Sequence, residues 1–234
     1  MVPAEESGRG FDEQGKEFRF IQRHGFKYLT GDRFSHVLGF GSAYGDELLP
    51  IISRIDKITI VDPSDAFTRD HVHGVPATYI KPTPNGALPL ADEVVDLITC
   101  LGVLHHIPNV SFVVGELART LKRGGHIVIR EPIISLGDWR KSRPGLTKRE
   151  RGIPLRILMD IVQGAGLQIE HTSLCGFPVV PRLFRTAPYN SGIATKIDSF
   201  LSNAFSWNIN YHPRTALQRF RPTSNFVLAV KPAH

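Results

Sequence analysis

A short apolar run that ends in a glycine-rich turn constrains this fold more than any other feature. Residues 37–40 are followed by Gly41, Ala43 and Gly45, and then by a segment of helical character. A strand that ends in small residues leaves backbone N–H groups bare at the start of a helix, where a nucleotide-like ligand comes close to the main chain. A glycine-rich turn that binds nothing has the same local pattern, so features elsewhere in the chain must decide.

Strand-like and helix-like segments alternate along most of the chain. Apolar, β-branched runs predict strands at residues 34–40, 57–62, 77–80, 94–100 and 126–130. An amphipathic helix is expected to start at Asn109 or Ser111 and to stop at Gly124-Gly125. Pro50 should leave the helix after the glycine-rich turn short or bent. The alternation favours a parallel sheet with helices on both faces, which binds ligands at the carboxyl ends of its strands.

The remaining segments divide the chain around this core. We expect a polar N-terminal segment and helix at 1–32, a core at 33–174, an insertion at 175–224, and a last core strand with a tail at 225–234. The insertion is longer than an ordinary connection and carries apolar and aromatic residues, which favours a cap with packing of its own. A membrane-surface helix is the alternative for the same residues.

Basic residues give the chain a formal net charge of +6 at pH 7, and many of them lie in residues 140–151. A solvated loop explains this segment, and so does a site for an acidic small molecule that is phosphorylated or nucleotide-linked. RNA is disfavoured as a partner because no RNA-binding motif accompanies these charges.

The two cysteines, Cys100 and Cys175, form neither a disulfide framework nor a C-x-x-C pair. They indicate a reducing compartment, so we expect a cytoplasmic protein and no metal site. No apolar run approaches the roughly 20 residues that span a bilayer. Residues 1–15 lack the apolar centre of a secretory signal. The oligomeric state stays open.

A carboxylate at the end of the second predicted strand narrows the ligand class. Asp62 follows Gly41 by about twenty residues, a spacing typical of nucleoside-binding folds in which the acid accepts hydrogen bonds from the ribose hydroxyls. A nicotinamide dinucleotide would need glycine where Tyr44 stands, because a large side chain there would crowd the pyrophosphate. The pattern therefore favours a nucleoside cofactor without a dinucleotide.

These residues resemble the class I S-adenosylmethionine-dependent methyltransferases. Gly41, Ala43 and Gly45 occupy the three glycine positions of the family's acid-x-Gly-x-Gly-x-Gly motif, and Gly39 stands where the family has its acid. Later motifs of the family are resembled by residues 87–98, 101–109 and 116–131. The likeness is greatest to the small-molecule branch, which includes quinone-biosynthesis, natural-product and sugar methyltransferases.

The resemblance implies an α/β fold: a Rossmann-like doubly wound sheet of seven strands, the last antiparallel, with an insertion between the last two strands that forms a cap. It implies S-adenosyl-L-methionine as the cofactor, with Asp62 on the ribose, Asn85 on the adenine amine, and Arg23 or His24 on the carboxylate. The implied cofactor-binding set is Gly39, Gly41, Ala43, Gly45, Asp62, Pro63, Asn85, Leu88, Cys100, Leu101 and Gly102.

Candidates for catalysis lie at the ends of the later strands. His105 and His106 are candidate bases, and Glu131 is expected to face the acceptor. Each also has a structural interpretation, since the histidines can pack or cap the next helix and Glu131 can pair with Arg130. An acceptor lid is expected at Asp138, Trp139 and Arg140.

The expected activity is a biosynthetic O-methylation: transfer of a methyl group to a small polar acceptor, a hydroxyl of a sugar or glycan-type substrate. Two alternatives are C-methylation of a quinone or natural-product ring and a pseudoenzyme that only binds the cofactor. RNA methylation is disfavoured because the chain has neither an Asn-Pro-Pro-Tyr segment nor a catalytic cysteine pair.

Overall fold

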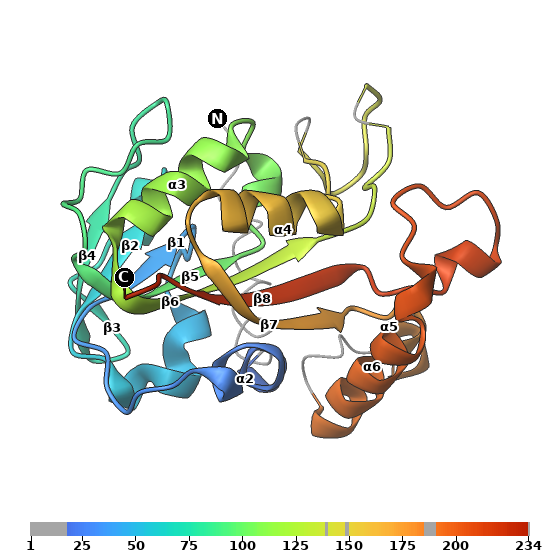
Figure 1. The fold of residues 1–234 in the computed structure, drawn as a ribbon, viewed down its shortest axis with the longest axis horizontal. Helices are drawn as coiled ribbons and strands as arrows, with labels where there is room; N and C mark the ends of the chain where they lie inside the picture. Colours follow the sequence, from blue (N-terminus) through green and yellow to red (C-terminus); the bar gives the residue numbers. More distant parts are fainter. Residues whose placement is uncertain (1–17, 139, 148–149, 185–190, 234) are drawn as a thin grey trace.

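The computed structural model describes residues 18–138, 140–147, 150–184 and 191–233. Its centre is one eight-stranded sheet with the strand order β3-β4-β2-β1-β5-β6-β8-β7 (Figure 1). The strands are β1 (Val37–Phe40), β2 (Ile58–Val61), β3 (His71–Val72), β4 (Val75–Ile80), β5 (Val95–Leu101), β6 (Leu121–Pro132), β7 (Gln168–Cys175) and β8 (Ser224–Val230).

The strand directions confirm the doubly wound α/β architecture. β1 pairs in parallel with β2 and β5, and the pairs β2–β4 and β5–β6 are also parallel. β8 runs antiparallel to both β6 and β7, so the last strand is the antiparallel one, as predicted. The chain winds outward in both directions from β1, and in such a sheet ligands bind beyond the carboxyl ends of the strands at this reversal point.

The sheet has eight strands where seven were predicted. The additional strand is β3, whose two residues pair antiparallel with β4. His73 and Gly74 between them have φ angles of 49° and 86°, the left-handed values of a two-residue hairpin turn. A two-residue strand carries no periodicity that a sequence pattern can display.

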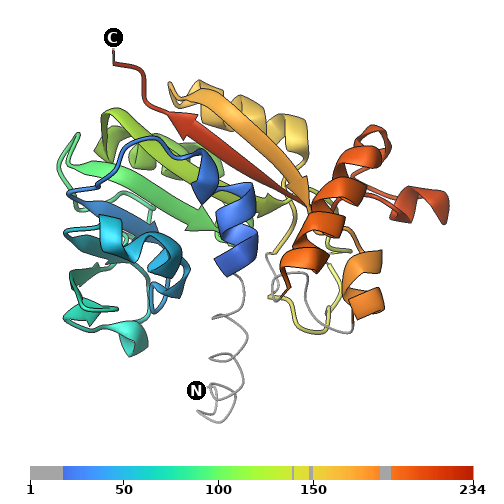
Figure 2. The same ribbon diagram turned by 90° about the horizontal axis from the view of Figure 1, so that it is seen from below.

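Helices cover both faces of the sheet (Figures 1 and 2). The α-helices are α2 (Phe18–His24), α3 (Val110–Thr120), α4 (Leu155–Gly164), α5 (Val179–Phe184) and α6 (Gly192–Ala204). The 3-10 helices are η1 (Phe26–Tyr28), η2 (Asp46–Arg54), η3 (Asp65–Phe67), η4 (Leu104–His106), η5 (Ser206–Asn208) and η6 (Leu217–Arg219). The helix after the glycine-rich turn is η2, a 3-10 helix throughout with Pro50 inside it, in agreement with the expected disturbance.

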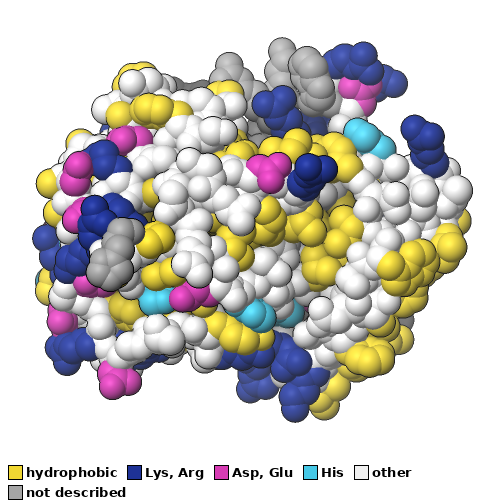
Figure 3. All heavy atoms as spheres, viewed as in Figure 1, with side chains coloured by type: hydrophobic (Ala, Val, Ile, Leu, Met, Phe, Trp, Pro, Cys, Tyr) yellow, Lys and Arg dark blue, Asp and Glu magenta, His cyan; other side chains and the backbone are white. Residues whose placement is uncertain are grey.

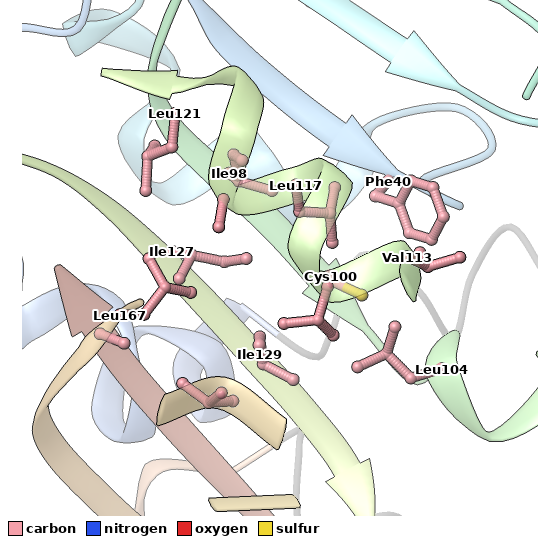
Figure 4. Packing of buried hydrophobic residues seen from close by; sticks show 14 of the residues in the cluster. Phe40, Ile98, Cys100, Leu104, Val113, Leu117, Leu121, Ile127, Ile129 and Leu167 are labelled. Carbon is pink, nitrogen blue, oxygen red and sulfur yellow. The ribbon is translucent and has the colours of Figure 1, made fainter. Parts of the chain in front are cut away.

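Two apolar cores lie on the two faces of the sheet. In one of them Ile98 and Ile127 of the strands lie against Leu117 of α3, and α4 closes the same side (Figure 4). The other core joins Leu97 of β5 to Phe20 of α2 and to apolar residues of η2. Because successive strand residues such as Leu97 and Ile98 point to opposite faces, each central strand contributes to both cores.

The boundary between α3 and β6 differs from the prediction. The helix ends at Thr120 and the strand begins at Leu121, so Gly124-Gly125 does not end the helix. Both glycines lie within β6, where the pairing with β5 is irregular between Leu121 and His126. Gly124 has a φ of 74°, a value that suits a β-bulge as well as a helix end, and this ambiguity explains the error.

Residues 175–224, which we call the cap, contain α5, α6, η5 and η6. Phe177, Val180 and Ala194 form a small core within it, and the buried Asp198 accepts hydrogen bonds from two backbone N–H groups after β7. The exposed large apolar side chains of the cap are Leu183, Ile193, Phe200, Trp207, Leu217 and Phe220. Figure 3 shows apolar surface, in yellow, on the side of the molecule that the cap occupies. Within the described ranges, no helix has both the length and the apolar character to cross a membrane.

Candidate functional site

The glycine-rich turn after β1 has a backbone that lets a ligand approach. Gly41, Ala43 and Gly45 have φ angles of 66°, 45° and 74°, in the left-handed region that favours glycine. A Cβ on Gly41 would lie 2.6 Å from Val103, so only glycine fits there. A cavity of about 140 Å³ borders the turn, and its lining residues are Ile21, Gly41, Ser42, Ala43, Asp46, Glu47 and Leu101.

Gly39 is enclosed by its neighbours. It pairs with Ile60 of β2 on one side and with Thr99 of β5 on the other. A Cβ at position 39 would lie 2.5 Å from Ser42 Oγ and 2.7 Å from Ile60 Cδ1. The side chain of Ser42 therefore fills the space that a larger residue at position 39 would need.

Glu47, at the start of η2, brings an unforeseen carboxyl group to this cavity. Thr99 Oγ1 lies 3.3 Å from Glu47 Oε1 and donates to it, and the Ser42 hydroxyl also donates a hydrogen bond to the carboxyl group. Burial raises the pKa of Glu47 to about 7, although the hydrogen bonds oppose that shift. At neutral pH this carboxyl group is therefore poised between its neutral and charged forms.

Asp62 lies at the carboxyl end of β2, as predicted, and faces the glycine-rich turn. Its Oδ2 accepts a hydrogen bond of 3.3 Å from Ala43 N, and its Oδ1 accepts one of 2.9 Å from Ser64 N. Pro63, the exposed residue between Asp62 and Ser64, lies at the same strand end. A carboxylate has about four acceptor positions, so Asp62 keeps lone pairs for ribose hydroxyls.

The segment after β5 forms the other side of the site. Leu101 borders the cavity, and Gly102 has a φ of 75° with space above it. Cys100 points into the core beside Leu117 (Figure 4), and Leu88 is buried in the same core. Any ligand contact at Cys100 or Leu88 is therefore made through the backbone.

Glu131, at the end of β6, organises the segment that carries His105. Its carboxylate is fully buried and accepts backbone hydrogen bonds from Val103, Leu104 and His105, with lengths of 2.9, 2.7 and 3.2 Å. It also lies 2.8 Å from His105 Nδ1. A carboxylate accepts hydrogen bonds, so the imidazole donates through Nδ1–H and directs Nε2 away from Glu131. Sequence reasoning placed Glu131 on the acceptor; the structure places it behind His105 instead.

His106 belongs to a second pair. Its Nδ1 lies 3.4 Å from Glu150 Oε1, and burial, followed by the proximity of His105, lowers its pKa. His105, His106 and Glu150 offer ligand atoms that lie within 4.8 Å of one another. This cluster is compatible with a cation, although Nδ1 of His105 is already bonded to Glu131; the expected absence of a metal stays a prediction.

A larger cavity of about 460 Å³ begins at His105 and runs between the starts of α3 and α4. Its lining is largely apolar, with Ile107, Phe112 and Ile157 among the residues, and Arg151 and Tyr211 add polar groups. The Tyr211 hydroxyl donates a hydrogen bond of 2.7 Å to Gly152 O, which ties the cap to the segment after β6. No sequence pattern points to Tyr211 or Glu150, because the residues that they contact, Gly152 and His106, lie far from them in the chain.

Other predicted residues lie apart from these two cavities. Asn85 uses its side-chain oxygen within its own turn, accepting from Thr83 Oγ1 and Ala87 N. Asp138 and Arg140 pair with each other, with 2.9 Å between Oδ1 and Nε, on an exposed loop. Trp139 lies outside the described residues.

The two candidates for the cofactor carboxylate differ. His24 is buried, lies 2.7 Å from Ser173 Oγ through Nδ1 and stacks on Phe226, so it packs α2 onto the sheet. Burial lowers its pKa to about 3. Arg23 has a buried Nε without a hydrogen-bond partner in the described part of the chain, and it remains the candidate.

Comparison with known proteins identifies the segment that carries this site. Residues 38–129, from β1 to β6, match the family model described as a methyltransferase domain. We call residues 38–129 the methyltransferase domain after this match. The match covers less than half of the chain, but it includes the glycine-rich turn, Asp62 and His105. The cofactor implied by this family is S-adenosylmethionine.

Two curated relatives of the methyltransferase domain have the same printed name. The ubiquinone biosynthesis O-methyltransferase of Proteus mirabilis (strain HI4320) is 35% identical over 54 residues, which cover 23% of this chain and 22% of that protein. The protein of that name from Photorhabdus laumondii is 33% identical with the same coverage. The chain thus matches about a fifth of the length of these relatives.

Solved structures share the whole fold. A candidate methyltransferase of Bacillus halodurans C-125 covers 94% of this chain and 99% of its own, with a TM-score of 0.60 and 18% identity. An S-adenosylmethionine-dependent methyltransferase of Mesorhizobium loti covers 88% and 94%, with a TM-score of 0.57 and 14% identity. The cyclase SpnF covers 94% and 82%, with a TM-score of 0.59 and 16% identity. At these identities the likeness shows the fold alone.

The methyltransferase domain fits its family's cofactor in most respects. Gly41 and Ala43 line the cavity at the turn, Asp62 offers acceptor lone pairs beside the turn, and the same cavity contains a carboxyl group from Glu47. Sequence reasoning missed Glu47 because an acid directly after Gly45 and Asp46 is typical of the first turn of any helix.

Proposed function

We propose that the chain transfers a methyl group from S-adenosylmethionine to a hydroxyl oxygen of a small acceptor molecule. The observation that carries this proposal is the 2.8 Å hydrogen bond between Glu131 and His105 Nδ1, at the start of the larger cavity. A hydroxyl is a poor nucleophile until its proton is removed, so a base held in one tautomer has a clear use at this position.

Residues of the chain have separate tasks in this reaction. The cofactor, when bound, supplies a methyl group on a positively charged sulfur, which is already reactive. The glycine-rich turn and Asp62 hold it in place. His105 Nε2 accepts the proton of the acceptor hydroxyl, and Glu131 stabilises the imidazolium that results. Proximity and orientation of the two reactants supply much of the rate.

The lining of the larger cavity favours an acceptor with an apolar body. Apolar side chains make up most of its wall, and Arg151 and Tyr211 provide the polar contacts. The partial likeness to proteins named ubiquinone biosynthesis O-methyltransferase also supports an oxygen on a ring-type acceptor. We therefore favour a phenolic hydroxyl over the sugar hydroxyl expected from the sequence, and the sugar remains the second candidate because of Arg151 and the basic loop.

The test is product analysis after incubation with methyl-labelled S-adenosylmethionine and a panel of phenols, quinols and sugars. The proposal expects one labelled methyl group on an oxygen of a phenolic acceptor, together with an equal amount of S-adenosylhomocysteine. Labelling of a sugar hydroxyl would overturn the favoured acceptor class. Labelling on carbon would overturn O-methylation.

Two further results would contradict methyl transfer itself or the role of His105 as the base. Cofactor binding without transfer to any acceptor would favour the pseudoenzyme. Unchanged turnover in His105→Ala would show that His105 is not the base. The neighbouring His106 would not act in its place, because it is already paired with Glu150.

A further inference from the structure

We propose that Glu47 binds the α-ammonium group of the cofactor and so takes the place of the acid that the glycine motif lacks at Gly39. The inference rests on the proposed function, because it presupposes that S-adenosylmethionine occupies the site. It assigns a subsite for a primary ammonium group to residues that begin η2 instead of residues that end β1.

An acid at position 39 has no space in this chain. Ser42 Oγ stands 2.5 Å from where a Cβ of residue 39 would lie. Real Cβ atoms do not approach other atoms so closely, so a longer side chain at this position would have to displace Ser42.

Glu47 brings a carboxyl group to the same place from another element. Its two side-chain hydrogen-bond donors are Ser42, which covers Gly39, and Thr99, which pairs with Gly39 in the sheet. The carboxyl group is thus held over the end of β1, where an acid on the strand would have projected.

Within the described residues no lysine, arginine or histidine forms an ion pair with Glu47, whose hydrogen-bond donors are two neutral hydroxyl groups and its own backbone N–H. A carboxylate that lacks a counter-charge in a poorly solvated place is unfavourable, and its proton affinity rises in consequence. A ligand ammonium in the adjoining cavity of about 140 Å³ would supply the missing charge.

Other titratable groups around Glu47 do not offer that counter-charge. Asp46, on the same helix, raises the pKa of Glu47 further, and it pairs with His73 at 2.9 Å. Tyr79, on β4, has a buried hydroxyl without a hydrogen-bond partner in the described ranges, and its pKa is raised by burial. From α2, the residue that borders the cavity is the apolar Ile21.

The experiment compares two ligands in a calorimetric titration. S-adenosylhomocysteine carries the ammonium group and 5′-methylthioadenosine lacks the amino-acid part, while both contain the adenosine that Asp62 would hold. We expect Glu47→Gln to weaken S-adenosylhomocysteine by about tenfold or more, the range of a hydrogen bond to a charged group. The affinity for 5′-methylthioadenosine should change less than about twofold.

Glu170→Gln is the matched control, since it removes a carboxylate on β7 that pairs with His126 of β6 and should leave both affinities unchanged. Equal weakening of both ligands by Glu47→Gln, or no weakening of either, would overturn the inference. If the wild-type protein binds neither ligand, the proposed function fails instead.

A second measurement on the wild-type protein does not depend on the stability of a variant. Titrations at pH 7 in buffers of different ionisation enthalpy count the protons released on binding. Because the Glu47 carboxyl must become charged to pair with the ammonium, S-adenosylhomocysteine should release about half a proton and 5′-methylthioadenosine none. Equal proton release with both ligands would contradict the inference.

Discussion

At the scale of single residues, Glu47 should make the stability of the ligand-free protein depend on pH. Its pKa is about 7 in the folded chain against an ordinary value of 4.5, so between these values the folded state binds more protons than the unfolded state. The free energy of unfolding therefore falls as the pH rises through this window. We expect a loss of roughly 2–3 kcal/mol, reduced by the solvent-accessible cavity beside the side chain.

Urea unfolding of the wild type and of Glu47→Gln at pH 4.5 and pH 8 measures this effect. The variant should gain stability relative to the wild type on going to pH 8. A difference between the two proteins that is the same at both pH values would show that Glu47 does not titrate in this range.

Ala43 permits a second prediction at the residue scale. It has a φ of 45° at a position where its family has glycine. Ala43→Gly should keep the free energy of unfolding within about 1 kcal/mol, because relief of the strained backbone offsets the extra entropy of the unfolded chain. Ala43→Val should lose more than about 1 kcal/mol, since a β-branched residue is a true outlier there. Equal stability of the two variants would contradict the strained geometry.

Some of the residue-scale chemistry was predictable and some was not. Asp62 could be named because it directly follows an apolar strand, where the ligand edge of such a sheet lies. His105 could be named because it lies in the segment after the next central strand, which resembles a motif of the family. The partner of His105 was named as well, but with the wrong task, since only the fold brings Glu131 behind the imidazole. Glu47 escaped notice because its partners, Ser42 and Thr99, come from different elements.

At the scale of elements, the turn η4 depends on Glu131. Replacing this carboxylate with an amide puts an NH₂ group against donors such as His105 Nδ1, and so frees the imidazole to turn or change tautomer. We expect Glu131→Gln to lower kcat by about 100-fold or more, the contribution of a positioned base. The affinity for S-adenosylhomocysteine should stay within about threefold.

His106→Gln is the comparison variant for this prediction and should change kcat much less, because His106 pairs with Glu150 and not with Glu131. The pH profile of kcat gives the additional readout: it should change in Glu131→Gln and persist in His106→Gln. Equal effects of the two variants would show that the two histidines act as one structural unit.

The close backbone approach within the segment after β6 can be tested with two glycines. A Cβ on Gly152 would lie 1.9 Å from Ile134 O, whereas one on Gly115, in α3, would meet nothing within 4 Å. Gly152→Ala should lose more than about 2 kcal/mol of stability through the steric clash. Gly115→Ala should gain up to about 1 kcal/mol through helix propensity. Thermal unfolding of both variants decides, and a tolerated Gly152→Ala would contradict the close approach.

Element boundaries were less predictable than element types. The strands of the sheet were expected from their apolar runs, but the hairpin of His73 and Gly74 and the early start of β6 at Leu121 were not. In both places the backbone has left-handed φ angles. A glycine with such an angle occurs in hairpin turns, in β-bulges and at helix ends, so the sequence pattern does not distinguish them.

At the scale of the whole molecule, the order of the strands accounts for the location of the site. β1 lies between β2 and β5, so the glycine-rich turn, Asp62 and the segment of His105 meet at one edge of the sheet. This convergence followed from the alternation of strands and helices alone. The cap was expected only as an elaboration, and its link through Tyr211 to Gly152 depends on packing that a local pattern does not encode.

The most direct test of the account is the transfer of a labelled methyl group, measured side by side in the wild-type protein and in His105→Ala. Both proteins should bind S-adenosylhomocysteine with similar affinity, because His105 serves the acceptor and not the cofactor. The account predicts a labelled methyl ether on the acceptor with the wild type and a loss of turnover of about 100-fold or more with the variant. Transfer at equal rates, or cofactor binding by both proteins with no methyl ether from either, would contradict it.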